Sequence, residues 1–156
     1  MITLIINESS YANAVPKVLF EASTSNTKVL GVTVAPSSIL LYVQSSSDVV
    51  NRLHELIRSQ DITKAIHSVD SLAMITVSGY ELEEIPGVVD IVVSPLAKAS
   101  INLYGALTIS SSIKIFIPWS DRDKAVSLIE GNLNKVNNLG GNLNEFRQGE
   151  AAEKNL

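Results

Sequence analysis

The sequence contains no cysteine among its 156 residues. A disulfide framework, a thiolate zinc site and a cysteine nucleophile are therefore all excluded. Aromatic residues are also scarce, at 5%, so the core must consist mainly of Val, Ile, Leu and Ala. No two basic residues are adjacent, and the net charge is −4. This balance argues against a nucleic-acid partner, because nucleic-acid-binding surfaces concentrate Lys and Arg on one face.

Long apolar runs are missing as well. No stretch approaches the ~20 residues that a membrane-spanning helix requires. The segment Met1–Asn7 has no basic residue and turns polar too early for a secretory signal. Hydrophobic residues nevertheless make up 46% of the chain and charged residues 18%, which is a globular balance. We therefore expect a folded, cytoplasmic protein with no membrane partner.

An internal repeat organises the sequence. Residues Gly31–Val43 and Gly105–Ile117 match at one constant offset, and each contains two apolar runs separated by a short serine-containing turn. Two shorter matches flank them in the same order: Val15-Pro16 with Ile85-Pro86, and Asp48 with Asp123. Three matches in the same order predict two copies of one structural unit.

Short β-branched runs bounded by polar residues predict the strands of each copy. Those of copy one are Ile2–Asn7, Lys28–Val34, Ile39–Gln44 and Ile62–Val69. Those of copy two are Leu72–Val77, Ile101–Thr108 and Ile113–Pro118. Copy two has no clear fourth strand, and we expect Asn142–Gln148 either to pair on a sheet edge or to fray.

Apolar residues at helical spacing predict two helices in each copy. The first should have Pro16 or Pro86 in its first turn, where proline is well tolerated. The second should begin at a capping Ser or Asp: Ser47 or Asp48 in copy one, Ser120 or Asp121 in copy two. Pro95 interrupts an otherwise helical stretch, so it should kink the helix or restart it.

The resulting order β-α-β-β-α-β is the ferredoxin-like, split βαβ motif. We therefore predict an α+β fold with two βαββαβ modules, each an antiparallel sheet with both helices on one face. Module 1 is placed at residues 1–70 and module 2 at residues 71–136. Residues 137–156 form a tail that contains the candidate edge strand and then becomes disordered. A single module exposes a sheet face and an edge, so we expect a homodimer or higher homo-oligomer.

Several motifs of copy two resemble an ACT domain, and most closely the second ACT module of the aspartokinase regulatory region. They are Ala73–Gly79, Ile85-Pro86-Gly87-Val88, Leu96–Leu103, Ser110–Ile117 and Asp123–Ala125. The most specific is Pro-Gly-Val followed at this spacing by Ala-Ser-Ile-Asn. The resemblance covers residues 72–130 well, and the repeat extends it to residues 1–70 as a partner module.

The resemblance implies a regulatory protein that binds an amino acid. In ACT modules the loop after the first strand and the start of the second strand meet across a module–module interface. Backbone groups there can hold the carboxylate and the ammonium of a ligand. The ligand-binding residues implied are Leu82, Glu83, Ile85, Gly87, Val88, Ile101, Asn102, Ser110, Ser111 and Ser112. Binding would control a biosynthetic enzyme such as aspartokinase, or the protein's own assembly.

Departures from the family pattern disfavour some amino acids as the ligand. Lysine-binding aspartokinase modules carry an acid where this sequence has Tyr104 and Leu30, and arginine-sensing relatives carry one where it has Ser112. A cationic side chain would lack a buried partner there, which is costly. Only the loop acids Glu81, Glu83 and Glu84 could substitute. Small polar or branched-chain amino acids fit the motif better.

Two other function classes stay open. The first is an ACT-fold interaction module that binds no ligand. The second is a small enzyme, but we expect no enzymatic activity, no cofactor and no metal. Glu83 and Glu84 are typical of a solvated loop before a helix, and His54 and His67 have no neighbours at ligand spacing. The serine runs lack a nucleophile elbow and are typical of turns and caps.

Overall fold

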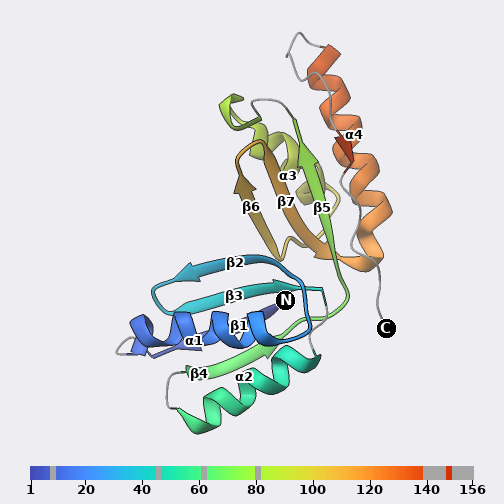
Figure 1. Cartoon of the computed structure of the whole chain (residues 1–156). Helices are drawn as coiled ribbons and strands as arrows, with labels where there is room; N and C mark the ends of the chain where they lie inside the picture. The colour runs from blue at the N-terminus through green and yellow to red at the C-terminus, as the bar shows by residue number, and fades with distance from the viewer. Residues whose placement is uncertain (8–9, 45–46, 61–62, 80–81, 139–146, 149–156) are drawn as a thin grey trace. The chain divides into compact units, whose positions relative to one another are not determined.

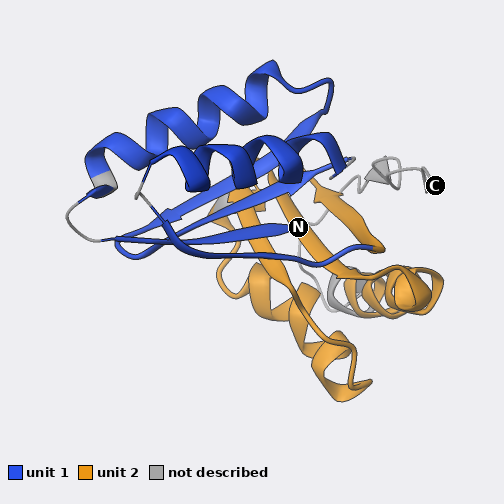
Figure 2. Ribbon diagram, turned by 90° about the horizontal axis from the view of Figure 1, so that it is seen from below, with its two compact units in different colours: residues 1–70, 155–156 blue, residues 71–154 orange. Residues whose placement is uncertain are grey.

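The computed structural model describes residues 1–7, 10–44, 47–60, 63–79, 82–138 and 147–148. Its contacts divide it into unit 1, residues 1–70, and unit 2, which starts at Ser71 (Figure 2). The elements, drawn in Figure 1, are β1 (Ile2–Ile6), α1 (Tyr11–Thr24), β2 (Val29–Ala35), β3 (Ser38–Val43), α2 (Ser47–Ser59), β4 (Thr63–Ser68), β5 (Leu72–Ser78), the 3-10 turn η2 (Leu82–Glu84), α3 (Val88–Lys98), β6 (Gly105–Ile109), β7 (Ser112–Pro118), the 3-10 turn η3 (Trp119–Asp121), α4 (Arg122–Asn138) and β8 (Arg147–Gln148).

Unit 1 is an antiparallel sheet in the strand order β2-β3-β1-β4. Side chains alternate between the two faces of a strand, and in β1 the residues Ile2, Leu4 and Ile6 are buried. Both helices, α1 and α2, cover this apolar face, as Figure 2 shows. The helices contribute the small and branched side chains Ala14, Val18, Ala22, Val49, Leu53 and Leu56 to the core.

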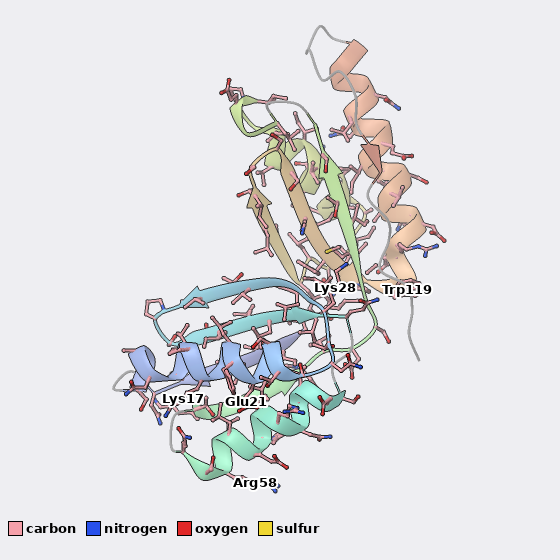
Figure 3. All side chains as sticks on the ribbon, viewed as in Figure 1. Lys17, Glu21, Lys28, Arg58 and Trp119 are labelled. Carbon is pink, nitrogen blue, oxygen red and sulfur yellow. The ribbon has the colours of Figure 1, made fainter. Side chains whose placement is uncertain are left out.

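Polar side chains at the rim of unit 1 link α1 to α2. The Arg52 guanidinium lies 3.0 Å from the Asp48 carboxylate and 4.0 Å from that of Glu21. Lys17 donates a hydrogen bond to the Gln60 side chain, and Figure 3 labels Lys17 and Glu21 on the helix that they share. These groups are largely exposed, so each contributes at most about 1 kcal/mol to stability.

Unit 2 repeats the architecture with the strand order β6-β7-β5-β8, again antiparallel throughout. Its core consists of the inward residues of β5 and β7 and one stripe of each helix: Ala73, Ile75, Val77, Ile113, Ile115, Ile117, Val88, Val92, Leu96, Ala125, Ile129 and Leu133. In Figure 2, α3 and α4 lie on one side of this sheet. The predicted α+β fold with two ferredoxin-like βαββαβ modules is confirmed.

One predicted strand begins too early. Residues Ile101–Thr108 were expected to be extended throughout, but β6 begins at Gly105. The cause is the end of α3, where Ser100 adopts a left-handed φ of 57°. The Ser100 N–H then donates to the Ala97 carbonyl, and the Ile101 N–H to the Leu96 carbonyl, each at 3.0 Å. This is a Schellman motif, which uses the residues just after the helix for capping.

The predicted role of the two aligned prolines is wrong. Pro16 is the sixth residue of α1, which begins five residues earlier at Tyr11. Pro86 precedes α3 by two residues and belongs to the loop. The Pro16 ring costs α1 one hydrogen bond, to the Ala12 carbonyl. Because Ala12 is exposed, water can replace that donor.

Pro95 neither ends α3 nor restarts it, since one helix continues from Val88 to Lys98. The missing N–H leaves the Ile91 carbonyl, one turn back, without its intrahelical donor. The side chain of Asn132 in α4 supplies a replacement, with its Nδ2 2.7 Å from the Ile91 oxygen. This bond allows the helix to pass through the proline.

The residues after the second module agree with the prediction in part, because two residues of the candidate segment pair on an edge of the sheet. Helix α4 continues to Asn138, past the predicted module boundary at residue 136. Arg147 and Gln148 form β8, opposite Ser78 and Val77 of β5, so unit 2 also has a fourth strand. The other residues of the candidate segment Asn142–Gln148 and those from 149 to 156 lie outside the described residues. In the described ranges, no helix has the length and hydropathy of a membrane span.

Candidate functional site

The ten implied ligand-binding residues fall into two groups at opposite ends of the unit 2 sheet. Strands β5 and β6 both run antiparallel to β7, and so parallel to each other. Their carboxyl ends carry the loop that starts at Gly79 and the turn Ser110–Ser112. Their amino ends carry Ile101 and Asn102. The two ends are separated by five-residue β6, about 15 Å of extended chain.

At the carboxyl end, the loop after β5 and the β6–β7 turn lie side by side. Ser78 is paired with Ser112 across the ladder, and the Gly79 N–H donates to the Ser111 carbonyl at 3.1 Å. Unit 1 has the equivalent bond, from the Ile6 N–H to the Ser37 carbonyl at 2.8 Å. Both units therefore fix the loop after the first strand against the hairpin turn.

The apolar members of the first group belong to the core. Leu82 in η2 is 1% exposed and Val88 is 7% exposed, and both lie in the unit 2 cluster. Ile85 is half-buried and packs against that cluster. Their side chains hold the loop on the sheet, so a ligand at this position would contact mainly backbone groups.

Gly87 sets the direction of the chain into α3. It is the residue before the helix and has a left-handed φ of 76°, which residues with a Cβ adopt only with strain. A Cβ on Gly87 would meet no other atom within 4 Å. The glycine is therefore required by its backbone conformation and not by a lack of space.

The start of α3 presents backbone donors. The Val88 N–H is bonded to the Ile85 carbonyl at 3.2 Å, and the Ile91 N–H to the Gly87 carbonyl at 3.1 Å. Between them, the N–H groups of Val89 and Asp90 belong to the first helical turn, which has no intrahelical acceptor for them. A helix N-terminus also carries partial positive charge and favours a carboxylate. The Asp90 carboxylate itself accepts a hydrogen bond from Ser94 Oγ at 2.7 Å.

The serine turn between β6 and β7 differs in how its hydroxyl groups are engaged. Ser110 is exposed, with a left-handed φ of 46°. Ser112 Oγ donates to the Ile109 carbonyl at 2.9 Å, a local bond typical of serine in turns. Ser110 thus presents its side chain to solvent, whereas the Ser112 hydroxyl proton is used within the hairpin.

At the amino end of the sheet, Ile101 and Asn102 differ in exposure. Ile101 is 6% exposed and lies in the unit 2 core, as expected of the apolar residue that follows a Schellman motif. Asn102 is exposed. Trp119, labelled in Figure 3, opens the η3 turn after β7, and the Arg122 guanidinium lies 4.9 Å from its ring centre.

The polar residues weighed as catalytic or metal-binding groups do not converge. Glu84, the last residue of η2, is exposed, and nothing of the Glu83 side chain is described. His54 on α2 and His67 on β4 are both exposed. Within the described parts of the chain, no three His, Cys, Asp or Glu residues gather in a way that could hold a metal ion.

Sequence reasoning missed two polar residues. Asn132 supports α3 from the neighbouring helix, and Pro95 was the signal that some donor was needed. Thr63, opposite Ile6 in unit 1, is 6% exposed, and its hydroxyl has no hydrogen-bond partner among the described residues. No sequence signal distinguishes Thr63 from other strand threonines.

Comparison with known proteins gives a match in structure only. No protein-family model and no curated protein matches the sequence. The ligand-free regulatory subunit of aspartate kinase from Thermus thermophilus is 17% identical, with a TM-score of 0.70 over 84% of this chain and 88% of that one. The chain has the fold of an aspartate kinase regulatory region.

Two further structures of this ACT fold support the assignment. A chain of the aspartokinase α and β subunits gives a TM-score of 0.75 at 15% identity, over 85% of this chain and 90% of that one. E. coli aspartokinase III in complex with lysine and aspartate gives 0.67 at 17% identity, over 85% of this chain and 30% of that one. The ACT resemblance read from the motifs of unit 2 is thus confirmed at the level of fold.

Proposed function

We propose that this protein is an amino-acid-binding regulator of the ACT type, with no catalytic activity of its own. The Gly87 turn carries the proposal: its left-handed residue leads into the first turn of α3, where the Val89 and Asp90 N–H groups have no intrahelical acceptor. The loop that precedes it is hydrogen-bonded at Gly79 to the β6–β7 turn, in which Ser110 is exposed. Backbone N–H groups and a helix N-terminus suit the carboxylate of a free amino acid. The fold is that of regulatory subunits of aspartate kinase, and one enzyme of this fold was solved with lysine and aspartate.

The proposed ligand is a small polar or branched-chain amino acid. Ile85 offers an apolar side chain before the turn, and Ser110 offers an exposed hydroxyl on the hairpin. Two acids close to Gly87 in the sequence, Glu84 and Asp90, are exposed and provide no buried partner for a cation. At the two positions where lysine-binding modules carry an acid, this chain has Tyr104 and Leu30. A bound lysine or arginine would bury a cation without a matching carboxylate, which costs several kcal/mol.

The proposed site requires a second copy of the chain. Within one unit 2, the Gly87 turn and Asn102 lie at opposite ends of the sheet. A neighbouring unit 2 in the reverse direction would bring its Asn102 end to the Gly87 end of the first. The edge strand β6, where Ala106, Thr108 and Ile109 are exposed, is available for such pairing. We therefore propose a homodimer, and light scattering that gives a 16.8 kDa monomer at micromolar concentration would exclude it.

Calorimetric titration with each of the twenty amino acids at millimolar concentration tests the function. We expect binding of one or a few small polar or branched-chain amino acids, and no binding of lysine or arginine. The complex should also unfold at a higher temperature, because a ligand that binds only the folded state stabilises it. If no amino acid produces either heat or a thermal shift, the function is refuted.

Substitution of Gly87 separates this function from the alternative, a ligand-free interaction module. That alternative draws support from the exposed edge of β6. Gly87→Val forces a β-branched residue into the left-handed region and should weaken amino-acid binding about tenfold or more. Gly87→Asn, which tolerates that region, is the matched control and should retain binding. An interaction module would keep its self-association in both variants and bind no amino acid.

A further inference from the structure

Helix α3 contains an internal proline whose lost hydrogen bond is replaced from another helix. In a regular helix, the N–H of residue 95 would donate to the Ile91 carbonyl, but proline has no N–H. Asn132 Nδ2 lies 2.7 Å from that carbonyl oxygen. Since a carbonyl can only accept, the side-chain amide of Asn132 is the donor.

The surroundings explain why a side chain, and not water, supplies this bond. Ile91 and Asn132 are both half-buried. The neighbouring Val92 of α3 and Leu133 of α4 are 0% and 4% exposed. A carbonyl without a partner in such an environment costs about 1–3 kcal/mol. The interface between α3 and α4 therefore requires a donor at this point.

One residue, Ile91, connects Asn132 to the Gly87 turn through its two backbone groups. The carbonyl of Ile91 accepts from Asn132, while the N–H of Ile91 donates to the Gly87 carbonyl at 3.1 Å. Residue 91 is thus fixed on both sides, by α4 at its carbonyl and by the turn at its N–H. No other residue of α3 combines a bond to the turn with a side-chain bond from α4 among those described.

We propose that Asn132 is a positioning residue: it replaces the donor that Pro95 lacks and so holds the first turn of α3, with Gly87, in the conformation that binds the ligand. The role in ligand binding depends on the proposed function. The role in holding the turn does not, and the two can be tested separately.

A double-mutant cycle with Pro95 tests the proposal. Asn132→Ala removes the side-chain donor, and Pro95→Ala restores a backbone donor to the same carbonyl. We expect Asn132→Ala alone to speed hydrogen exchange of the Val88 and Ile91 amides, which donate to Ile85 and Gly87, about tenfold and to weaken amino-acid binding by a similar factor. In the Pro95→Ala background, Asn132→Ala should change either quantity by less than about twofold.

Asn134→Ala is the matched control, because Asn134 is exposed on the same helix; it should change neither quantity. Equal effects of Asn132→Ala with and without Pro95 would overturn the proposal, as would unchanged exchange of the Val88 and Ile91 amides. If the wild type binds no amino acid but exchange follows the cycle, the proposed function fails and the holding role of Asn132 stands. If an amino acid binds but Asn132→Ala changes neither the exchange rate nor the affinity, the proposed function stands and the positioning role fails.

Discussion

Units 1 and 2 share one strand order but connect their first strand to their first helix differently. In unit 1, α1 begins at Tyr11, after Ser10 in ordinary helical geometry. In unit 2, the connection from β5 to the first helix is longer. It contains the η2 turn and the left-handed Gly87, and α3 starts at Val88. The repeat therefore preserved the core and the ladder, while the segment at the carboxyl end of the sheet diverged. Among the described residues, a left-handed glycine before the first helix is found in unit 2 and not in unit 1.

The internal prolines show the same divergence. Pro16 and Pro95 each remove one hydrogen bond from a first helix. Pro16 leaves the Ala12 carbonyl without its helical donor, and Ala12 is exposed. Pro95 leaves the Ile91 carbonyl without its donor, and Asn132 donates a hydrogen bond to it instead. The carbonyl that an internal proline leaves without its donor can be hydrogen-bonded by water if it is exposed. If it is buried, another protein group must donate to it.

The largest expected effect compares equivalent core residues of the two units. Ile39 and Ile113 align in the repeat and are 0% and 2% exposed. Truncation of either to Ala should cost about 2–5 kcal/mol, from lost apolar contact and the cavity that remains. Trp119, the only tryptophan, lies in unit 2, so its fluorescence reports the unfolding of that unit.

The midpoint of denaturant unfolding, followed by Trp119 fluorescence, should therefore fall more in Ile113→Ala than in Ile39→Ala. Far-ultraviolet circular dichroism should detect the loss of stability in both variants. An equal shift of the fluorescence transition in the two variants would show that the units unfold as one and would remove the basis for comparing them separately.

A smaller effect of opposite sign in the two units is expected at the ends of the first helices. Ser100 follows α3 with a φ of 57°, so Ser100→Gly should stabilise the protein by about 1 kcal/mol. Ser25 follows α1 with a φ of −72°, and its Oγ donates to the Ala22 carbonyl at 2.6 Å. Ser25→Gly should therefore destabilise by about 1 kcal/mol. Thermal unfolding of both variants checks the signs, and the same sign in both would contradict the two cap geometries.

The smallest effect at neutral pH concerns Tyr42, which aligns with Phe116. Burial raises the pKa of the Tyr42 phenol above its usual 10.0, because the phenolate is disfavoured away from water. The stability that depends on the neutral phenol is complete below pH 10 and is lost as the pH rises through the folded-state pKa. Tyr42→Phe should unfold less readily than the wild type at pH 11 and about equally at pH 7. Identical stability curves of the two proteins across that range would contradict a buried, neutral Tyr42.

Much of the fold could be predicted from local pattern. The β-branched runs placed most strands within a residue or two, because side chains that alternate between core and solvent impose their period on the sequence. The errors occurred at the ends of helices, whose exact positions the sequence pattern does not specify. The start of β6 was displaced by the Schellman motif at Ser100, and α1 began before Pro16 because the chain packs there onto the sheet.

The candidate site was predictable only in part. The ACT-like motif named Gly87 as a ligand-binding residue, but only the structure shows its left-handed conformation, which glycine adopts without strain. The pattern could not show that Leu82 and Ile101 would be buried in the core, since an apolar residue outside a long helix or strand is compatible with either role.

The amino-acid sequence by itself determined the class of fold, the duplication and the absence of thiol chemistry, because these follow from composition, period and order along the chain. Only the tertiary structure decided that the implied site residues stand at opposite ends of one sheet and that Asn132 serves the carbonyl left by Pro95. Both depend on which groups meet across the fold. An internal proline indicates from the sequence that a helix carbonyl needs another hydrogen-bond donor. Which residue provides that donor depends on the packing of the neighbouring helix.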